Sequence, residues 1–491
     1  MKRSAKRGAL RASARRDQAS FGSRRRAGVL LHPSSLDGPD PIGDIGPSTH
    51  RFLRWLASAG FTSWQMLPIG PVGEGNSPYS SRSSFAGEPM LLSLDAMVEE
   101  GWLPRRRLEQ ARRAAPRTSG WAAARRSKLP LLLEAYEGFL ARRGAHRADY
   151  LRFLEDSYRP PTRWLWHWLT CDTSVKSLGA TAFLQYAFDL QWSALRRTAR
   201  ELGIELIGDL PIFVAPDSAD VVANPELFRL DRQRRPSIVT GVPPDLFSKN
   251  GQLWGHPHYR WSAHRRDGFR WWRERVRAAL DRFDSLRIDH FVGFVHAFEI
   301  PAAHRTAKHG RWRPTPGREL LAALRREFGE LPFIAEDLGA VTAEVVRLRD
   351  EFGLPGMRLL QNAFGGGDSL DLPHRHPEHC VVYPGTHDND TIAGWWRTLD
   401  AASRRRALDY AGGSSREIVS SLLRLALTSP ANLCVIPMQD LLALGSQARM
   451  NKPWQSRGQW EWRLPANWLT RIDAAAWKRR IDAARRSPRH A

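Results

Sequence analysis

Residues 285–291, SLRIDHF, end an apolar, strand-like run with the polar side chains of Arg287, Asp289 and His290. Charges at such a position cost several kcal/mol to bury unless other groups compensate them. A buried structural ion pair would explain the pattern. A strand that carries a catalytic carboxylate at its end would explain it as well.

Short apolar runs of this kind recur eight times, at residues 28–32, 63–68, 204–209, 285–291, 332–337, 356–361, 381–388 and 432–440. Helix-like segments lie between several of them. Residues 48–60, for example, have Ser48 as the expected N-cap, an apolar face and Gly60 after the end. A strand and a helix in repeated alternation predict an α/β fold, a (β/α)8 TIM barrel.

The ends of these runs are polar, which the barrel interpretation explains. The side chains at or next to the carboxyl ends of the expected strands are His32, Asp209, Asp289, Glu336, Asp388 and Asp440. The carboxyl ends of the strands carry the active site in a (β/α)8 barrel. We therefore expect an active site built largely from acids.

Uneven spacing between the runs predicts insertions and tails. About 135 residues separate the second run from the third, which indicates inserted helices at about 90–200. A stretch rich in Pro, Gly and aromatic residues at about 241–261 is expected to form a long loop that acts as a lid. The catalytic barrel is expected over 27–470, after a basic tail at 1–26 and before a basic C-terminal helix or tail at 471–491.

The net charge of +23 has a simple distribution. Residues 1–26 hold ten Lys or Arg against one Asp, and the remaining excess is mostly Arg dispersed along helical faces. We interpret it as compositional bias rather than as the footprint of a nucleic-acid protein. An organellar transit peptide is an alternative interpretation of the leader.

The three cysteines, Cys171, Cys380 and Cys434, lie far apart and share no spacing typical of a metal site or a disulfide framework. A reducing cytoplasm is therefore the expected location. No apolar run approaches the roughly 20 residues needed to cross a bilayer.

Several acids at one site, without clustered Cys or His, indicate glycosidic-bond chemistry. One carboxylate attacks or stabilises the sugar carbon while another donates a proton, and neither a cofactor nor a metal is required. Arg287 precedes Asp289 by two residues and shares its strand face, so it should keep Asp289 ionised as the nucleophile. Glu336 has no adjacent cation in sequence and is the better proton donor.

The motifs, taken in order, resemble those of the 4-alpha-glucanotransferases (amylomaltases or disproportionating enzymes) of glycoside hydrolase family 77. The resemblance covers about residues 26–464 and is carried by LLHPSSL, WQMLPIGP, NSPYSS, GDLPIFVA, GVPPDLFS, GQLWG, RIDHF, IAEDLG, GTHDND and ARMNKP. It implies a (β/α)8 barrel that transfers segments of α-1,4-glucan.

The resemblance also implies residue roles. Asp289 would be the nucleophile, Glu336 the general acid/base and Asp388 the third acid, which holds sugar hydroxyls. The substrate-binding residues that it implies are Asp209, Arg287 and His387 beside the scissile bond, Ser77 and Tyr79 near them, and Asp245, Phe247, Gln252 and Trp254 on the lid.

The chain departs from the family's pattern at Glu74, Asn76, His256, Val292 and Trp454. None of these positions is one of the three acids. They leave a remote glucan site and product size open.

The expected function is retaining transfer between α-1,4-glucans such as maltooligosaccharides and amylose, with glycogen and starch as further candidates. The transfer passes through a covalent glucosyl-enzyme, with the carboxyls of Asp289 and Glu336 roughly 5 to 5.5 Å apart. An amylase-like hydrolase of the same clan and an inactive glucan-binding protein are the alternatives.

Overall fold

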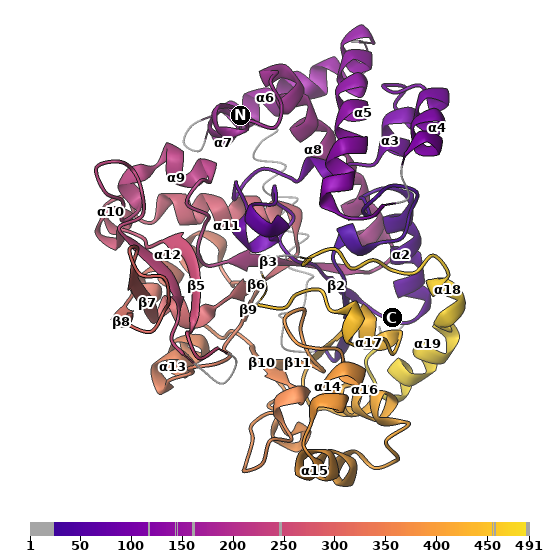
Figure 1. The fold of residues 1–491 in the computed structure, drawn as a ribbon, viewed down its shortest axis with the longest axis vertical. Coiled ribbons are helices and arrows are strands. Elements are labelled where there is room, and N and C mark those ends of the chain that lie inside the picture. Colours follow the sequence, from indigo (N-terminus) through magenta and orange to yellow (C-terminus); the bar gives the residue numbers. More distant parts are fainter. Residues whose placement is uncertain are drawn as a thin grey trace.

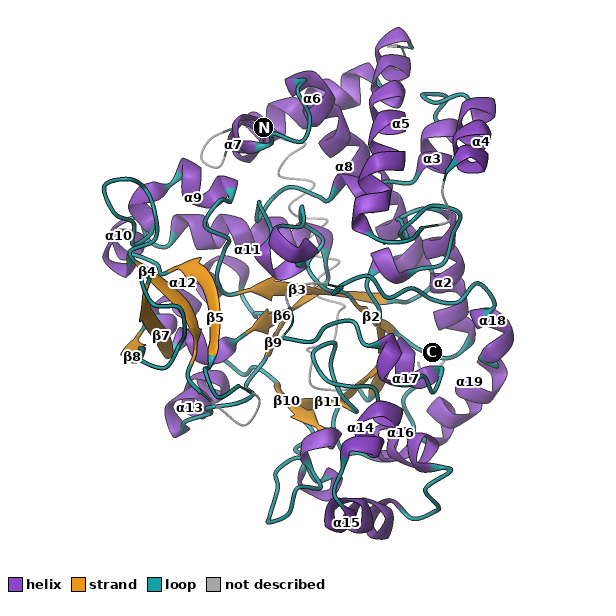
Figure 2. Ribbon diagram, in the orientation of Figure 1, coloured by secondary structure: helices purple, strands orange, loops and turns teal. Residues whose placement is uncertain are grey.

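The structure, a computed structural model, describes residues 24–115, 118–142, 144, 146–159, 163–244, 248–453, 455 and 458–487. At its centre lie eight parallel strands (Figures 1 and 2): β1 (Arg26–Leu30), β2 (Ser63–Gln65), β3 (Glu205–Pro211), β6 (Ser285–Asp289), β9 (Phe333–Ala335), β10 (Gly356–Leu359), β11 (Cys380–Tyr383) and β12 (Leu433–Pro437).

These strands form a barrel in the order β10-β11-β12-β1-β2-β3-β6-β9. The N–H of Ala335 on β9 donates to Pro355 O, just before β10, at 2.9 Å, and so joins the two ends of that order. Each of the eight runs expected from the sequence contributes one strand. The predicted (β/α)8 barrel is therefore confirmed.

Helices surround the barrel (Figure 2). They are α2 (Pro47–Ser58), α3 (Leu94–Glu99), α4 (Arg105–Ala114), α5 (Trp121–Ala141), α6 (Arg147–Tyr158), α7 (Trp164–Cys171), α8 (Leu178–Glu201), α9 (Ala219–Ala223), α10 (Trp261–Arg266), α11 (Arg270–Arg282), α12 (Gly317–Phe328), α13 (Ala343–Glu351), α14 (Ile392–Thr398), α15 (Ala401–Ala411), α16 (Ile418–Thr428), α17 (Met438–Leu441), α18 (Trp468–Arg471) and α19 (Ala474–Ala483).

The start of α2 differs from the expectation. Its N-cap is Gly46 and its first residue is Pro47, so the expected N-cap at Ser48 is wrong. Proline is favoured at the first helical position because its fixed φ already suits the helix and its missing N–H would have no partner there.

The helical insertion after β2 also ends earlier than expected. Helix α8 contacts β3, α2 and α11, so it belongs to the ring of helices around the barrel. Helices α3 to α7 gather on one side, at the top of Figure 1. The segment expected at about 90–200 thus combines an added helical part with one helix of the barrel itself.

A second, antiparallel sheet lies beside the barrel, in the order β5-β4-β7-β8. Its strands are β4 (Ile238–Val242), β5 (Gln252–Pro257), β7 (His296–Pro301) and β8 (Arg311–Pro314). The long loop expected at about 241–261 therefore contains the end of β4 and the whole of β5, and among its described residues only the segments beside these strands are loop. Gly241 fits the pairing of β4 with β5 closely, because a Cβ there would lie 2.1 Å from Gln252 O.

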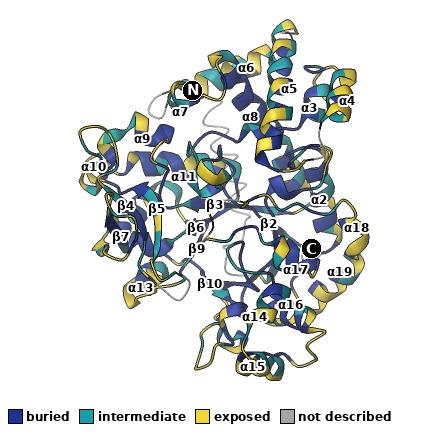
Figure 3. Ribbon diagram, viewed as in Figure 1, coloured by how far each residue is buried: buried dark blue, intermediate teal, exposed yellow. Residues whose placement is uncertain are grey.

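Side chains alternate between two cores along the barrel strands. On β12, Leu433 and Val435 belong to the cluster inside the barrel, whereas Cys434 and Ile436 pack with the surrounding helices. Burial on both faces explains why the strands read as continuous apolar runs. Figure 3 shows the barrel strands as buried and the outer faces of helices such as α15 and α19 as exposed.

The C-terminal segment is hydrogen-bonded to the amino end of the barrel. The guanidinium of Arg486, which is fully buried, donates hydrogen bonds to Leu427 O (2.6 Å), Ser429 O (2.8 Å) and Arg26 O (2.9 Å). Arg25 donates to Ser429 O as well, at 2.7 Å. The last residues of the expected 1–26 tail therefore belong to the barrel, and residues 1–23 lie outside the described part.

Candidate active site

The register of three neighbouring strands brings the acids together. Asp209 on β3 pairs with Arg287 on β6, and Ile288 on β6 pairs with Ala335 on β9. The N–H of Glu336 donates to Ile288 O at 3.1 Å, which extends that register by one residue. Neighbouring strands lie about 4.8 Å apart. Asp289 and Glu336, the residues that follow the pair, thus lie side by side at the carboxyl ends of β6 and β9.

Arg287 links two of the acids. Its Nη1 donates to both carboxylate oxygens of Asp209, at 2.8 and 3.0 Å, and to Oδ1 of Asp289 at 2.9 Å. The hydroxyl of Tyr79 donates to Asp209 Oδ2 at 2.8 Å. The side chains of Arg287 and Asp209 are 4% and 0% exposed, whereas that of Asp289 is 26% exposed. Asp289 is the member of this network that faces open space.

Asp388 lies after β11 and is held by residues from a distant segment. Asn451 Nδ2 donates to Asp388 Oδ1 at 2.6 Å, and Arg449 Nη2 donates to the Asp388 main-chain oxygen at 2.7 Å. His387 Nε2 lies 3.4 Å from Asp388 Oδ2. The imidazole of His387 is stacked on the ring of Tyr79, with centroids 5.2 Å apart. Asp388 itself is 42% exposed.

The carboxyl group of Glu336 favours the protonated form. Its pKa is raised to about 8, mainly by burial, with the charge of Asp289 adding to the shift and Arg287 opposing it. The main-chain N–H of His290 donates to Glu336 Oε2 at 2.6 Å. His290 has a left-handed backbone (φ 53°), a conformation that costs a non-glycine residue about 1–2 kcal/mol.

The Tyr79 hydroxyl lies within the electrostatic influence of three of the acids. The pKa of Tyr79 is raised well above its ordinary value, first by burial and then by the negative charges of Asp209, Asp289 and Asp388, while Arg287 opposes the shift. Burial also raises the pKa of Asp209 to about 7. Asp209, Asp289 and Asp388 come from the ends of different strands, and the charges of all three act on this tyrosine.

The expected lid residues are only partly described. Trp254 on β5 donates from Nε1 to Gln252 Oε1 at 3.2 Å and meets the ring of His290 edge-on, with centroids 4.9 Å apart. Asp245 and Phe247 lie outside the described residues. Ser77 lies next to the site because it contacts Tyr79: the Ser77 Oγ accepts a hydrogen bond from the main-chain N–H of Tyr79 at 3.2 Å.

Two of the polar strand ends have other contacts. Asp440 accepts a hydrogen bond from the main-chain N–H of Ile392, at 2.7 Å, and so caps the first turn of α14. Burial, with a further contribution from His387, lowers the pKa of His32 to about 3 and keeps its imidazole neutral. Asp440 has a structural contact that its place in the sequence did not reveal.

Sequence reasoning assigned no role to Asn451, Arg449 or the main chain of His290. Asn451 and Arg449 stand in ARMNKP, one of the motifs that carry the family resemblance, so this motif was the available signal. Their contact with Asp388 spans more than 60 positions of the chain, and nothing in the local pattern predicts it.

Within the described ranges, no group of three or more His, Cys, Asp and Glu side chains is arranged to hold a metal ion. Likewise, no helix among the described residues combines the length and apolar character needed to cross a membrane.

The chain as a whole is similar to known 4-alpha-glucanotransferases. The family model of glycoside hydrolase 77, described as 4-alpha-glucanotransferase, matches residues 31–166 and 169–470. A 4-alpha-glucanotransferase of Thermus thermophilus is 43% identical over 481 residues, which cover 90% of this chain and 95% of the relative. The chloroplastic/amyloplastic 4-alpha-glucanotransferase DPE1 of Arabidopsis thaliana is 41% identical over 478 residues, covering 91% and 82%.

A solved structure supports the same assignment. An amylomaltase from Streptococcus agalactiae, in complex with acarbose, superposes with a TM-score of 0.89 at 32% identity and covers 95% of this chain and 100% of that one. The chain therefore belongs to glycoside hydrolase family 77, the 4-alpha-glucanotransferases, and is a transferase enzyme.

Proposed function

We propose that the enzyme transfers α-1,4-glucan segments between maltodextrins with retention of configuration, through a covalent glucosyl-enzyme. The observation that carries the proposal is the contrast between two adjacent carboxyls. Asp289 accepts a hydrogen bond from the Arg287 guanidinium, whereas the pKa of Glu336 is raised to about 8. A retaining mechanism needs one ionised nucleophile and one protonated acid at neutral pH.

In the first step, the carboxylate oxygen of Asp289 that Arg287 does not hold attacks the anomeric carbon. The glycosidic C–O bond breaks, and the proton of Glu336 goes to the leaving oxygen. In the second step, Glu336 takes the proton of the acceptor hydroxyl as that oxygen attacks the same carbon. The bond to Asp289 breaks, so both carboxyls return to their initial states.

Asp388 and the groups around Asp209 bind the sugar in this proposal. Asp388 is exposed, yet Asn451 fixes one of its oxygens, so the other can accept hydrogen bonds from sugar hydroxyls. His387 and Tyr79 form a stacked pair beside it. Gln252 and Trp254 would contact the acceptor side from β5, together with Asp245 and Phe247.

Incubation with maltotriose tests transfer against the hydrolase alternative. Transfer leaves the number of reducing ends constant while longer and shorter oligomers form, whereas hydrolysis raises that number. We expect constant reducing ends and a ladder of products by chromatography. A steady rise in reducing ends with no longer oligomers would contradict the proposal.

Two variants test the roles of the acids. Glu336→Gln should lower kcat by about 10²- to 10⁴-fold, the usual contribution of a general acid. With an α-maltosyl fluoride, whose leaving group needs no proton, this variant should accumulate a glycosyl adduct on Asp289, detectable by mass spectrometry. Asp289→Asn should bind maltodextrin but transfer nothing. An adduct on another residue would refute the assignment, and unchanged activity in Asp289→Asn would do so too.

We also infer an intracellular compartment for the enzyme, the cytoplasm or an organelle. Cys171, Cys380 and Cys434 are free thiols, which suits a reducing compartment. The relative from Arabidopsis is named as chloroplastic/amyloplastic, which supports the organellar alternative. A fluorescent reporter fused behind residues 1–26 distinguishes the two locations.

A further inference from the structure

Trp460 connects two rings that stand beside the catalytic acids. Its ring centroid lies 5.7 Å from that of Tyr79 and 6.0 Å from that of His387. Tyr79 and His387 are also stacked on each other, so the three rings form one cluster. No step of the proposed mechanism uses Trp460, yet its ring contacts both aromatic side chains that the mechanism places beside the sugar.

The ring of Trp460 has a fixed position. It is 7% exposed and packs with the apolar cluster inside the barrel. The main-chain N–H of Trp460 donates to Met450 O at 2.9 Å. Its backbone is left-handed (φ 64°), a conformation that is unfavourable for a residue with a Cβ. Such a conformation persists only where the surrounding structure imposes it, and it is often found at functional sites.

Helix α5, in the inserted helical part, holds the main chain of Trp460. Trp121, the first residue of α5, is buried and donates from Nε1 to Trp460 O at 3.0 Å. The carboxylate of the next residue, Glu461, lies at the start of the same helix: a Cβ on Gly120, the N-cap, would be 3.0 Å from Glu461 Oε1. A negative charge is favourable there because of the helix dipole. The insertion therefore reaches the site through residues 460 and 461.

The segment that leads to Trp460 also holds His387. The main-chain N–H of Asn451 donates to His387 O at 3.2 Å, in addition to the contact of the Asn451 side chain with the third acid. The N–H of Lys452 donates to Gln459 Oε1 at 2.7 Å. The residues just before Trp460 thus lie beside those that follow Asn451, and one closed loop supports this side of the site.

We propose that Trp460 is a positioning residue for the site: its ring sets the orientation of the Tyr79–His387 pair, and α5 anchors it there. The hydroxyl of Tyr79 donates to Asp209, which accepts the hydrogen bonds of Arg287. Because this hydroxyl lies at the end of a rigid ring, a tilt of the ring would lengthen the bond to Asp209, and hydrogen bonds weaken steeply when their geometry is lost. The inference rests on the proposed function, since the pair borders the sugar of the glucan donor.

Release of fluoride from α-maltosyl fluoride tests the proposal, because kcat/KM for this substrate covers only the steps up to cleavage of the C–F bond. Trp460→Ala should lower kcat/KM about 10- to 100-fold, since misplacement by about 1 Å can cost about 100-fold. Trp460→Phe keeps an aromatic ring and should recover most of this loss. An unchanged kcat/KM in Trp460→Ala, or equal losses in the two variants, would overturn the inference.

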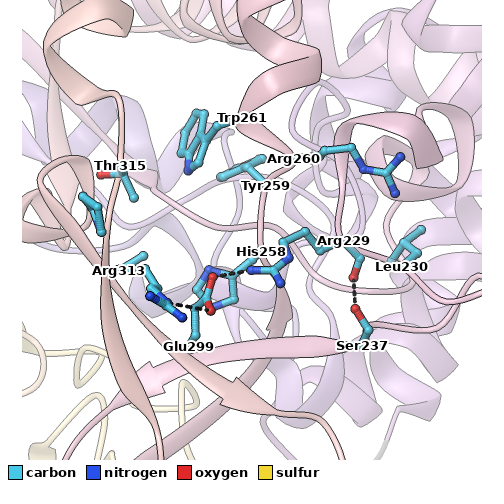
Figure 4. A pocket seen from close by; sticks show the side chains of 12 residues that line it. Arg229, Leu230, Ser237, His258, Tyr259, Arg260, Trp261, Glu299, Arg313 and Thr315 are labelled. Atoms are coloured by element: carbon cyan, nitrogen blue, oxygen red, sulfur yellow. Dashed lines mark hydrogen bonds and ion pairs between the residues drawn. The ribbon is translucent and has the colours of Figure 1, made fainter.

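Trp261→Ala is the matched control. Trp261 also contacts a tyrosine and a histidine, Tyr259 and His264, with ring centroids 4.9 and 5.4 Å away. Its ring, however, lines a separate cavity of about 390 Å³ beside the antiparallel sheet (Figure 4), and none of the three catalytic acids, all of which are described, lines that cavity. Trp261→Ala should keep the wild-type kcat/KM even if its melting temperature falls. A loss of kcat/KM as large as that of Trp460→Ala would overturn the inference.

A double-mutant cycle separates positioning from packing alone. Tyr79→Phe keeps the ring but removes the hydroxyl that binds Asp209. If Trp460 orients this hydroxyl, Trp460→Ala should cost at least about twofold less in kcat/KM when residue 79 is already Phe, because the effects of coupled residues do not add. Equal costs in the two backgrounds would mean that Trp460 acts without Tyr79, and the inference would be wrong.

Trp121→Phe tests the anchor while the Trp460 ring stays in place. It removes the donor to Trp460 O, and the loss of one hydrogen bond should lower kcat/KM about threefold to tenfold. Trp168→Phe is its control: Trp168 is another buried tryptophan of the inserted helices, and its Nε1 has no hydrogen-bond partner among the described residues. Its kcat/KM should equal that of the wild type. Equal values in Trp121→Phe and Trp168→Phe would refute the role of α5.

Fluoride is released whether a sugar or water later takes the glycosyl group, so the readout does not depend on the acceptor. A wild-type enzyme that releases no fluoride would refute the proposed function. A wild-type enzyme that releases it, with no difference between Trp460→Ala and Trp261→Ala, would refute only the role of Trp460.

Discussion

At the scale of single residues, the chemistry depends on which partner each carboxyl has. Asp289 has the guanidinium of Arg287, and Glu336 has only the main-chain N–H of His290. The two acids come from adjacent strands, yet their environments differ in burial as well as in these partners: the carboxyl of Glu336 is desolvated by burial, whereas the side chain of Asp289 is 26% exposed. Burial is the main cause of the raised pKa of Glu336, and Arg287 opposes that shift while it donates a hydrogen bond to Asp289.

The raised pKa of Glu336 predicts a pH dependence of stability. Between its ordinary value of 4.5 and about 8, the folded enzyme keeps a proton that the unfolded chain has lost, so Glu336 lowers the free energy of unfolding as pH rises. Glu336→Gln carries no titrating proton. We expect its melting temperature to exceed that of the wild type by a margin that widens from about pH 4.5 to about pH 8.

The control for this measurement is Glu319→Gln. Glu319 is exposed, and the hydrogen bond from Arg265 lowers its pKa, so both its folded and its unfolded forms are largely deprotonated above about pH 5.5. The margin between Glu319→Gln and the wild type should therefore be constant from about pH 5.5 to about pH 8, where that of Glu336→Gln still widens. A constant margin for Glu336→Gln over the same interval would contradict the assigned protonation.

Asn451 should act as a positioning residue for Asp388. Removal of its amide in Asn451→Ala frees the Asp388 carboxylate, and a hydrogen bond to a charged group contributes about 1.5–3 kcal/mol. We expect kcat/KM for maltotriose to fall about 10- to 100-fold. Asn451→Asp should lose more, because two carboxylates would then face each other.

Asn467 is exposed, so the variant Asn467→Ala serves as a control, and its kcat/KM for maltotriose should equal that of the wild type. The pH profile of kcat adds a readout beyond folding, since Asn451→Asp places a new titrating group beside the site and should recover activity at low pH. An Asn451→Asp enzyme with the wild-type profile would show that Asn451 does not act on Asp388.

At the scale of elements, Asp440 links β12 to the first turn of α14. Its buried carboxylate accepts the Ile392 N–H, and burial raises its pKa to about 7. Asp440→Asn keeps an oxygen acceptor, whereas Asp440→Ala leaves the N–H without one. We expect the alanine variant to lose about 1–3 kcal/mol in urea denaturation and the asparagine variant to retain wild-type kcat.

The stability and kcat of these variants show whether Asp440 is a structural acid or a catalytic one. Asp388→Asn is the comparison, because Asp388 is exposed at the site and should lose activity without losing stability. If kcat fell as far in Asp440→Asn as in Asp388→Asn, Asp440 would belong to the catalytic group after all.

Elements buried on both sides were predictable from the sequence, and the others were less so. Every barrel strand is an apolar run, since its two faces lie against the inner cluster and the helices. The antiparallel sheet was missed because β4 contains Gly241 and β5 contains Gly255 and Pro257, residue types that normally indicate loops, and because β4 pairs with β7 far along the chain.

The residues of the site likewise include some that were predictable from the sequence and some that were not. Asp209, Asp289 and Glu336 were predictable because strand ends position them. The hydrogen bond from Asn451 to Asp388 was not, because it joins two loops more than 60 residues apart. Periodicity reports the local environment of a residue and carries no information about such pairs.

At the scale of the whole molecule, Arg486 joins the end of the described chain to its beginning. Its guanidinium binds main-chain oxygens of Arg26, Leu427 and Ser429. Arg486→Met should cost about 3 kcal/mol or more, because these buried oxygens lose a charged donor. Arg485→Met is the matched control, since the neighbouring Arg485 is exposed, and it should unfold like the wild type.

Denaturant unfolding measures both variants, and transfer activity at low temperature shows whether each is folded. The catalytic acids lie at the opposite end of the strands, so folded Arg486→Met should keep its kcat. Equal stability of the two variants would mean that Arg486 does not hold the two ends of the barrel together.

The contacts of Arg486 can form only after residue 486 has been added during biosynthesis. A ribosome adds about 5–20 residues each second, so a chain of 491 residues takes roughly 25 to 100 s to make. Until residues 433–437 have been made, β1 lacks its neighbour β12, and the main-chain oxygen of Arg26 waits still longer for Arg486. A nascent polypeptide of this enzyme therefore presents an open edge of β1 to chaperones until β12 has left the ribosome.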